Sequence, residues 1–354
     1  MVSDIRRKIK KAIAEDGTVL FVGAGISTWC DIPGWGRLLE DMADYVDRVG
    51  GDSAGIRKYK DSQPLLAADL AKRELTGEQY HGFLKSEMRV RTSKPGEIHQ
   101  LLLDLGINCY ITTNFDRLLE RAIRANGRRG RLKVVTNTDV QQCVDLCTIK
   151  SRNFVFKPHG DIMDGDSIIF TNSDYRDMYE NGGRYYAHRT LDTLLATRNV
   201  IFVGFGLTDP DFLRIMDRFR NDYKQGVAEK YAIMPDVPAE EMNYWKAAYG
   251  IQILSYDTIP AVNGRDYSTI FKVLRELAPA GKKNSLTAKD GREAPDVITQ
   301  RQRKGLALYA QSVMARFKTN EESIFPLELC PDSCMGLVQS ISTEEMLKRE
   351  VRGF

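Results

Sequence analysis

The stretch 18–37, TVLFVGAGISTWCDIPGWGR, decides how the rest of the chain is interpreted. Its apolar run, 19–22, predicts a buried β-strand that ends in Gly23-Ala24-Gly25, followed by the hydroxyl side chains of Ser27 and Thr28. A strand that runs into a glycine-rich turn is typical of the start of a nucleotide-binding α/β unit. Since glycine has no Cβ, Gly23 and Gly25 can take strained backbone angles and let a phosphate approach closely.

The strict dinucleotide fingerprint G-x-G-x-x-G is not met, because Thr28 stands where its third glycine would be. The motif therefore leaves two interpretations open. Either the turn binds a phosphate at the start of the following helix, or the two glycines only pack the strand against a neighbouring loop.

Short apolar runs alternate with helical patterns along most of the chain, which predicts an α/β fold with a Rossmann-like, doubly wound and mostly parallel sheet. We expect this domain to cover residues 1–285, with a helical insertion at about 51–96, and a helical extension to cover 286–354. The strands are expected at 19–22, 108–112, 132–135, 153–157, 167–171, 199–203, 230–234 and 251–256.

The overall composition is that of an ordinary globular protein, with 42% hydrophobic and 28% charged residues among 354. A formal charge of +3 does not by itself indicate nucleic-acid binding, and the local basic clusters are interpreted as solvated surface. No stretch is apolar and long enough for a transmembrane helix. The N-terminal 17 residues are interpreted as an amphipathic first helix, and we expect a cytoplasmic protein.

Two cysteine pairs, Cys143/Cys147 and Cys330/Cys334, raise the possibility of a four-cysteine zinc site. The first pair has a spacing that places both sulfurs on one face of a helix, whereas structural zinc knuckles usually show the tighter C-x2-C spacing. Buried free thiols are therefore the favoured interpretation, and no metal is expected.

Polar residues follow several of the predicted strands at their carboxyl ends, where open α/β sheets bind ligands. Asn114 and Asp116 follow one strand, and His159, flanked by Pro158 and Gly160, follows another. A histidine there could act in catalysis or be structural, and Asp116 could equally cap the helix that begins after it.

Five motifs together resemble the sirtuin family, and more closely its bacterial branch found in antiphage defence systems than the protein deacetylases. They are GAGIS at 23–27, IPGW at 32–35, TTNFD at 112–116, PHGD at 158–161 and GFGLTDP at 204–210. The resemblance covers about residues 15–277 and implies NAD as the bound molecule.

The resemblance implies three catalytic residues, Asn114, His159 and Asp116. Asn114 and Asp116 would line the nicotinamide–ribose pocket, and His159 corresponds to the family's catalytic histidine. The residues implied to bind NAD are Gly23, Ala24, Gly25, Ser27, Trp35, Thr113, Gly204, Phe205, Thr208 and Asp209.

The chain also departs from the deacetylases, because it has no cysteine between His159 and Cys330 and thus no zinc ribbon after the histidine motif. This departure favours hydrolysis of NAD to nicotinamide and ADP-ribose, with NAD as substrate, over deacylation of a protein. A non-catalytic subunit that senses NAD or ADP-ribose is the alternative from another class. NADP or another dinucleotide could also be the substrate.

The same resemblance implies partners. We expect a homo-oligomer and a separate sensor or activator subunit, such as a ring-forming ATPase of the DNA-translocase type, with residues 298–354 as a candidate contact surface. Neither a membrane nor direct binding to nucleic acid is expected.

Overall fold

The computed structural model describes residues 2–127, 132–147, 151–179, 184–207, 213, 216, 228–261 and 264–279. The extension predicted for 286–354 lies outside these described residues. So does the helix that the pattern DFLRIMDRFR predicts at 211–220, apart from Leu213 and Met216. Within the described ranges, no helix combines the length and the apolar character that crossing a membrane requires.

A seven-stranded sheet organises the fold, with strand order β3-β4-β2-β1-β5-β6-β7. All of its strand pairs are parallel. Its strands are β1 (Val19–Val22), β2 (Cys109–Thr112), β3 (Lys133–Thr136), β4 (Phe154–Lys157), β5 (Val200–Val203), β6 (Lys230–Pro235) and β7 (Ile251–Tyr256). This confirms the predicted parallel sheet. The chain builds one half outward from β1 and the other from β5, so the ligand-binding switch point of such folds lies between these two strands.

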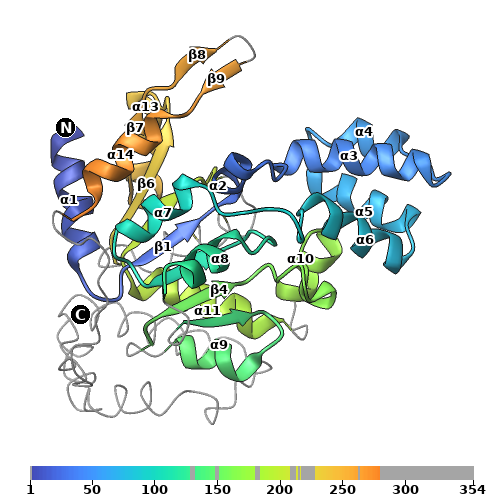
Figure 1. The fold of residues 1–354 in the computed structure, drawn as a ribbon, viewed down its shortest axis with the longest axis horizontal. Helices are drawn as coiled ribbons and strands as arrows, with labels where there is room; N and C mark the ends of the chain where they lie inside the picture. Colours follow the sequence, from blue (N-terminus) through green and yellow to red (C-terminus); the bar gives the residue numbers. More distant parts are fainter. Residues whose placement is uncertain are drawn as a thin grey trace, which may run out of the picture.

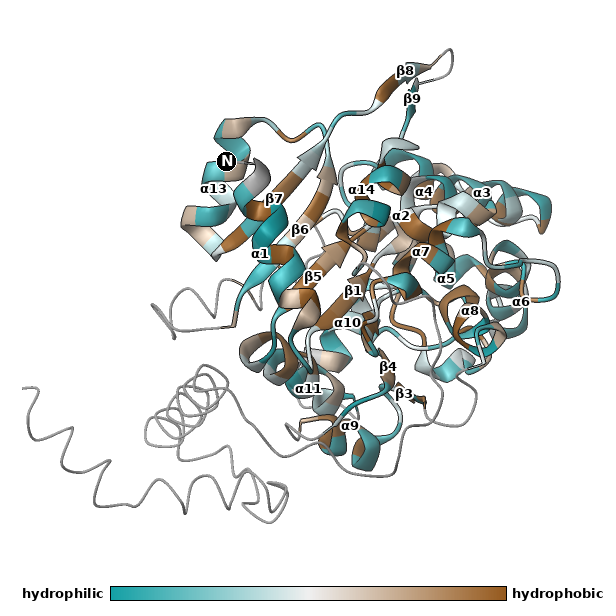
Figure 2. Ribbon diagram, turned by 60° about the vertical axis from the view of Figure 1, so that its left-hand side comes forward, coloured by the Kyte–Doolittle hydropathy of each residue, from teal (hydrophilic) through white to brown (hydrophobic). Residues whose placement is uncertain are grey.

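Helices cover both faces of the sheet, as a doubly wound fold requires (Figure 1). Val19 and Phe21 of β1 face one apolar core, and Leu20 and Val22 face the other, because successive side chains of a strand alternate. The first core contains side chains from α9 (Val140–Leu146), α11 (Tyr185–Thr197) and α13 (Ala239–Tyr249). The second contains side chains from α1 (Val2–Ala14), α7 (Glu97–Asp104), α8 (Leu118–Ala125) and α14 (Thr269–Leu277). Figure 2 shows hydrophobic strands at the centre and hydrophilic outer helix faces.

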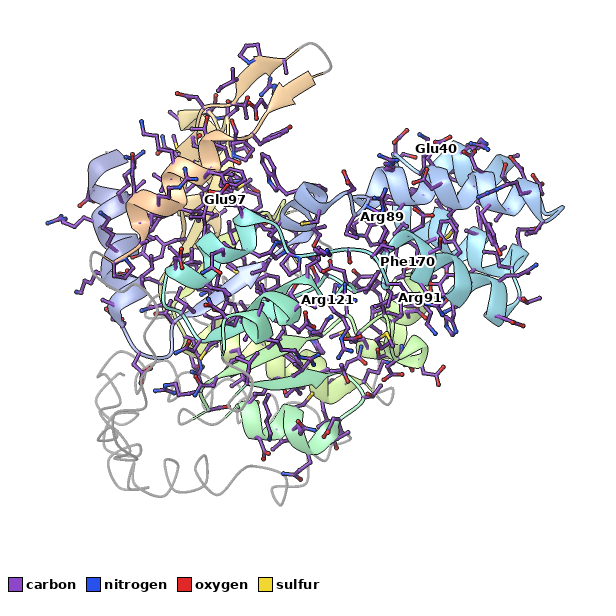
Figure 3. All side chains as sticks on the ribbon, viewed as in Figure 1. Glu40, Arg89, Arg91, Glu97, Arg121 and Phe170 are labelled. Carbon is purple, nitrogen blue, oxygen red and sulfur yellow. The ribbon has the colours of Figure 1, made fainter. Side chains whose placement is uncertain are left out.

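The helical insertion lies beyond one end of this layered body (Figure 1). It follows the short α2 (Ala24–Ser27) and comprises α3 (Trp35–Arg48), α4 (Ala54–Tyr59), α5 (Pro64–Glu74) and α6 (Gly77–Glu87). These helices share a third apolar core with Phe115, Ile162 and Phe170 of the sheet-edge loops. Phe170 lies where the insertion meets the main body (Figure 3).

One prediction about the middle of the chain is wrong. Residues 167–171 do not form a strand: Ser167 ends a short 3₁₀ turn, and the backbone bond from Ile169 N to His159 O, at 2.9 Å, connects the segment to the loop after β4. The segment is apolar because Ile168 and Phe170 fill the insertion core, while both edges of β4 are already paired with β2 and β3. Two helices follow this segment, α10 (Asn172–Tyr179) and α11.

A second, two-stranded sheet was not predicted from the sequence. It is an antiparallel hairpin of β8 (Ile259–Ala261) and β9 (Gly264–Asp266) that projects from the end of β7 (Figure 1). Asp236 holds its base, because its carboxylate accepts from the Thr258 backbone N–H at 2.9 Å and pairs with Arg265.

Candidate functional site

A cavity of about 780 Å³ lies at the carboxyl ends of the strands, next to the switch point between β1 and β5. Such a volume is within the range of small-molecule and cofactor sites. Most of its wall is apolar, with a few polar groups. It is lined by Ala24, Gly25, Ile26, Thr28, Trp29, Trp35, Pro64, Leu65, Thr113, Tyr175, Gly204, Phe205, Gly206, Ile233, Met234, Pro235, Tyr256, Tyr267 and Ile270.

The GAGIS loop forms one wall of this cavity, and its two glycines pack against the loop after β5. Gly23 and Gly25 are not in the left-handed region; the strained glycine is Gly204, at φ +61°. A Cβ on Gly23 would lie 2.3 Å from Gly204 O, and Gly25 N donates to that same oxygen at 2.9 Å. The expectation of strained angles at Gly23 and Gly25 is therefore wrong: their missing side chains admit the loop after β5.

A second, smaller cavity of about 50 Å³ continues from the first and contains the three predicted catalytic residues, Asn114, Asp116 and His159. Both cavities are lined by Ala24, Trp35 and Thr113, so they are adjacent. The second is also lined by Ser27, Ile32, Pro33, Leu38, Met88, Phe115 and Phe170. Residues from four separate motifs thus converge on one small cavity.

Asn114 is held in a defined orientation. Its side-chain Nδ2 donates to Gly23 O at 3.1 Å and to Ser27 Oγ at 2.9 Å. Since Gly23 O can only accept, the amide cannot be turned around without losing this bond. Its other atom, Oδ1, is buried and has no hydrogen-bond partner among the described residues. A buried acceptor without a donor is costly, which marks Oδ1 as a position for a ligand hydroxyl or a water.

Asp116 is engaged at both carboxylate oxygens. Oδ2 accepts from Ser27 Oγ at 2.6 Å, and Oδ1 accepts from the backbone N–H of Leu118 at 2.8 Å, in the first turn of α8. The capping role left open by the sequence is therefore present, and the same side chain also fixes Ser27, which in turn holds Asn114. This arrangement makes Asp116 a support for Asn114.

His159 is buried, with 3% of its surface exposed, and its ring contacts Tyr175 edge-on at a centroid distance of 5.3 Å. The turn after it needs a glycine: Gly160 has φ +92°, and a Cβ there would lie 2.1 Å from Ser167 O. Asn137 fastens the same turn by donating to Pro158 O at 2.8 Å and to Ser167 O at 2.7 Å. The histidine thus stands on a rigid loop.

The remaining predicted residues are placed as follows. Trp35 stacks on Phe170 at 4.6 Å between ring centroids, and Phe205 packs on Phe21 at 4.8 Å while lining the larger cavity. Thr113 lines both cavities. Thr208 and Asp209 lie outside the described residues.

Sequence reasoning missed a buried charged cluster behind these loops. Lys157, the last residue of β4, is fully buried and pairs with Glu120 at 2.9 Å and Asp161 at 3.1 Å. The signal available in the sequence was that a lysine ends an otherwise apolar strand. Since lysine is almost never fully buried unless it is paired, a buried lysine there would have predicted nearby carboxylates. The cavity aromatics Trp29, Tyr256 and Tyr267 were also missed.

The described cysteines, Cys30, Cys109, Cys143 and Cys147, are all free thiols. Cys143 Sγ lies 3.3 Å from Thr136 O, and burial raises the pKa of its thiol to about 12, which disfavours the thiolate that zinc binds. In the part of the chain that the structure describes, no group of three or more His, Cys, Asp or Glu could hold a metal ion. Cys330 and Cys334 lie outside it.

Comparison of this chain with known proteins found a matching family model and several curated relatives. Residues 108–254 match the family model described as a SIR2-like domain. A protein named NAD(+) hydrolase ThsA from Enterococcus faecium is 28% identical over 294 residues, which cover 77% of this chain and 57% of that protein. Its namesake from Bacillus cereus (strain MSX-D12) is 25% identical over 280 residues, covering 75% and 55%.

Another relative, named Defense-associated sirtuin 2 from Bacillus subtilis, is 24% identical over 291 residues, which cover 80% of this chain and 27% of that protein. The chain thus spans about half the length, or less, of these curated relatives. Among solved structures, a Sir2 homologue in complex with NAD is 14% identical, covers 77% of this chain and 93% of that one, and has a TM-score of 0.36.

Proposed function

We propose that the chain is an NAD+ glycohydrolase, on the premise that its residues 108–254 match the SIR2-like family model. It would cleave the bond between the nicotinamide nitrogen and the ribose and release nicotinamide and ADP-ribose. The observation that carries the proposal is the small cavity lined by both His159 and Asn114, whose buried Oδ1 has no partner among the described residues, next to a cavity large enough for the rest of a dinucleotide. The relatives named NAD(+) hydrolase support it.

Cleavage of the bond between nicotinamide and ribose requires groups that hold the ribose and activate a water molecule. As the glycosidic bond breaks, positive charge spreads onto the ribose, and a water oxygen bonds to the anomeric carbon while nicotinamide leaves with the bonding electrons. Asn114 Oδ1 would accept a hydrogen bond from a ribose hydroxyl or from the attacking water. His159 would bind a ribose hydroxyl and take up the proton of the water, a role worth ~10²–10⁴-fold in rate.

Release of nicotinamide from NAD by the purified protein tests the proposal. Asn114→Ala and His159→Ala should each lower the release rate by at least about 100-fold. Unchanged rates in both variants would contradict the assignment of these residues. If NAD raised the melting temperature without any turnover, the protein would instead be a sensor of NAD or ADP-ribose. Nicotinamide release that depends on an acyl-lysine peptide would identify a deacylase.

We further propose that this activity depletes NAD in the cytoplasm during phage infection. The name of the Bacillus subtilis relative supports a role in defence. Because unrestrained hydrolysis would kill the host, we propose control by homo-oligomerisation and by a separate sensor or activator subunit, such as a ring-forming ATPase. The test is to infect cells that carry the gene and its neighbours: NAD should fall in the wild type and stay constant with Asn114→Ala.

A further inference from the structure

Lys157 joins the two loops that carry Asn114 and His159. Its Nζ donates to the backbone carbonyls of Phe115 at 3.3 Å and Asp116 at 2.6 Å, both in the loop after β2. The same Nζ donates to Asp161 Oδ2 at 3.1 Å, in the loop after β4, only two residues beyond His159. One buried ammonium thus connects the Asn114 loop to the His159 loop.

The cluster around Lys157 extends this connection to both loops and to α8. Glu120 Oε1, in the first turn of α8, accepts from Lys157 Nζ at 2.9 Å. The Asp161 carboxylate also pairs with Arg117 Nε at 3.2 Å, and its Oδ1 accepts from Met163 N at 2.9 Å. The loop after β4 is therefore bound to the loop after β2 through two cations that share one carboxylate.

The charge state of Lys157 suits this role. Burial alone would lower the pKa of the ammonium, but Glu120, Asp161 and Asp116 more than offset burial and raise the pKa of Lys157 above its usual value. The lysine therefore stays charged at neutral pH. A buried ion pair adds little net stability compared with apolar residues of similar volume, whereas removing one partner leaves a buried charge unpaired. Its more specific contribution is to fix the geometry of the groups that it contacts.

We propose that Lys157 is a positioning residue that fixes Asn114 and His159 relative to each other for glycosidic bond cleavage. The proposal rests on the NAD+ glycohydrolase activity proposed above. Lys157 does not line either cavity, so it acts through the loops and not by contact with NAD. Because a misplacement of about 1 Å can cost about 100-fold in rate, loss of the ammonium should lower kcat far more than it changes the KM for NAD.

The test compares Lys157→Met with Lys230→Met. Lys230 is a matched control, because it is the other buried lysine of the described sheet and lies at the opposite, N-terminal end of β6. Lys157→Met should lower kcat for nicotinamide release by about 100-fold, with KM within about threefold. Lys230→Met should leave both constants near those of the wild type.

Amide hydrogen exchange supplies a readout that does not depend on activity. Lys157→Met should accelerate exchange in both loops, residues 113–120 and 158–163, whereas Lys230→Met should not. A Lys157→Met protein with wild-type kcat, or with unchanged exchange in the two loops, would overturn the inference. If the wild-type protein released no nicotinamide under any condition, the proposed function would fall, and the exchange result would still decide whether Lys157 holds the loops together.

A more conservative variant tests the same inference if Lys157→Met does not fold. Asp161→Asn keeps the size of the side chain and removes the charge that both Lys157 and Arg117 share. We expect it to lower kcat by about tenfold and to accelerate exchange in 158–163, because one of the two loops loses its ionic contacts. Wild-type kcat together with wild-type exchange in Asp161→Asn would likewise overturn the inference.

Discussion

Ser27 Oγ donates a 2.6 Å hydrogen bond to Asp116 Oδ2, across 89 positions of sequence. The same oxygen accepts from Asn114 Nδ2 at 2.9 Å. One hydroxyl therefore links the GAGIS loop to Asn114 and Asp116 of the TTNFD motif, and it helps to determine in which direction the Asn114 amide presents its unpartnered Oδ1. The serine that the family resemblance associated with NAD binding thus also orients Asn114, a predicted catalytic residue.

Ser27→Ala should lower kcat for nicotinamide release by about ten- to 100-fold, because Asn114 loses one of its two anchors and Asp116 Oδ2 is left without its donor. Stability should fall by about 1–3 kcal/mol, the cost of an unsatisfied buried acceptor. Steady-state kinetics and denaturant unfolding measure the two effects. The control is Thr18→Val, which removes a buried hydroxyl that donates to Ala12 O at the other end of β1. Equal kcat values for the two variants would contradict the role of Ser27.

Gly23→Ala should destabilise the protein by about 1–3 kcal/mol or more, because its Cβ would lie 2.3 Å from Gly204 O and 2.6 Å from Phe205 Cα. Backbone atoms cannot move aside as a flexible side chain can. Gly82→Ala, within α6, is the matched control: a Cβ there meets nothing within 4 Å, so stability should rise by up to about 1 kcal/mol. Urea unfolding midpoints should move in opposite directions for the two variants.

Buried His99 predicts a pH dependence of stability. Burial lowers the pKa of its imidazole in the folded state below the 6.5 of an exposed histidine, although nearby Asp116 partly opposes this shift. The unfolded chain therefore binds the proton first, and stability present above pH 6.5 is lost as the pH falls toward the folded-state value. The limiting slope is about 1.4 kcal/mol per pH unit. His99→Gln should remove this component between pH 6.5 and 5, and an unchanged profile would contradict the prediction.

Asp174 fastens α5 of the insertion to the main body, and its removal should cost about 2–3 kcal/mol. Its Oδ2 accepts from the backbone N–H groups of Phe170 at 3.1 Å and Thr171 at 2.9 Å, and its Oδ1 accepts from Lys72 of α5 at 2.9 Å. Asp174→Ala loses all three charge-assisted bonds. Lys72→Met removes only a half-exposed partner and should cost less than about 1 kcal/mol. Thermal or urea unfolding separates the two.

The pKa of Asp174 predicts how its contribution to stability changes at acidic pH. Burial raises the pKa, but Lys72 and the two backbone amides outweigh burial and lower it below 3.8. The stability that Asp174 contributes is thus complete above about pH 4 and is lost as the pH falls through the folded-state pKa. The difference between wild type and Asp174→Ala should shrink below that pH, and a constant difference would contradict the argument.

Much of the sheet was predictable because short apolar runs bounded by glycine or polar residues are a local signal. Residues 19–22 and 200–203 are both buried on two faces, and such strands have continuous apolar sequences. The same signal failed at 167–171, because burial against the insertion requires apolar residues just as a strand does. An apolar run indicates that a segment is buried, but it does not indicate whether the backbone of that segment hydrogen-bonds to a neighbouring strand.

The motifs of the chain were sufficient to predict that Asn114, Asp116 and His159 gather at the sheet edge, since parallel strands present their carboxyl ends together. Tertiary structure alone decided how those residues are used. It brought Gly204 against Gly23, gave Asp116 two donors, left Oδ1 of Asn114 unpartnered, and buried Lys157 between the two loops. Local sequence patterns report the period and burial of an element, whereas a contact between distant residues depends on how the elements pack. The orientation of the site is therefore a property of the folded chain.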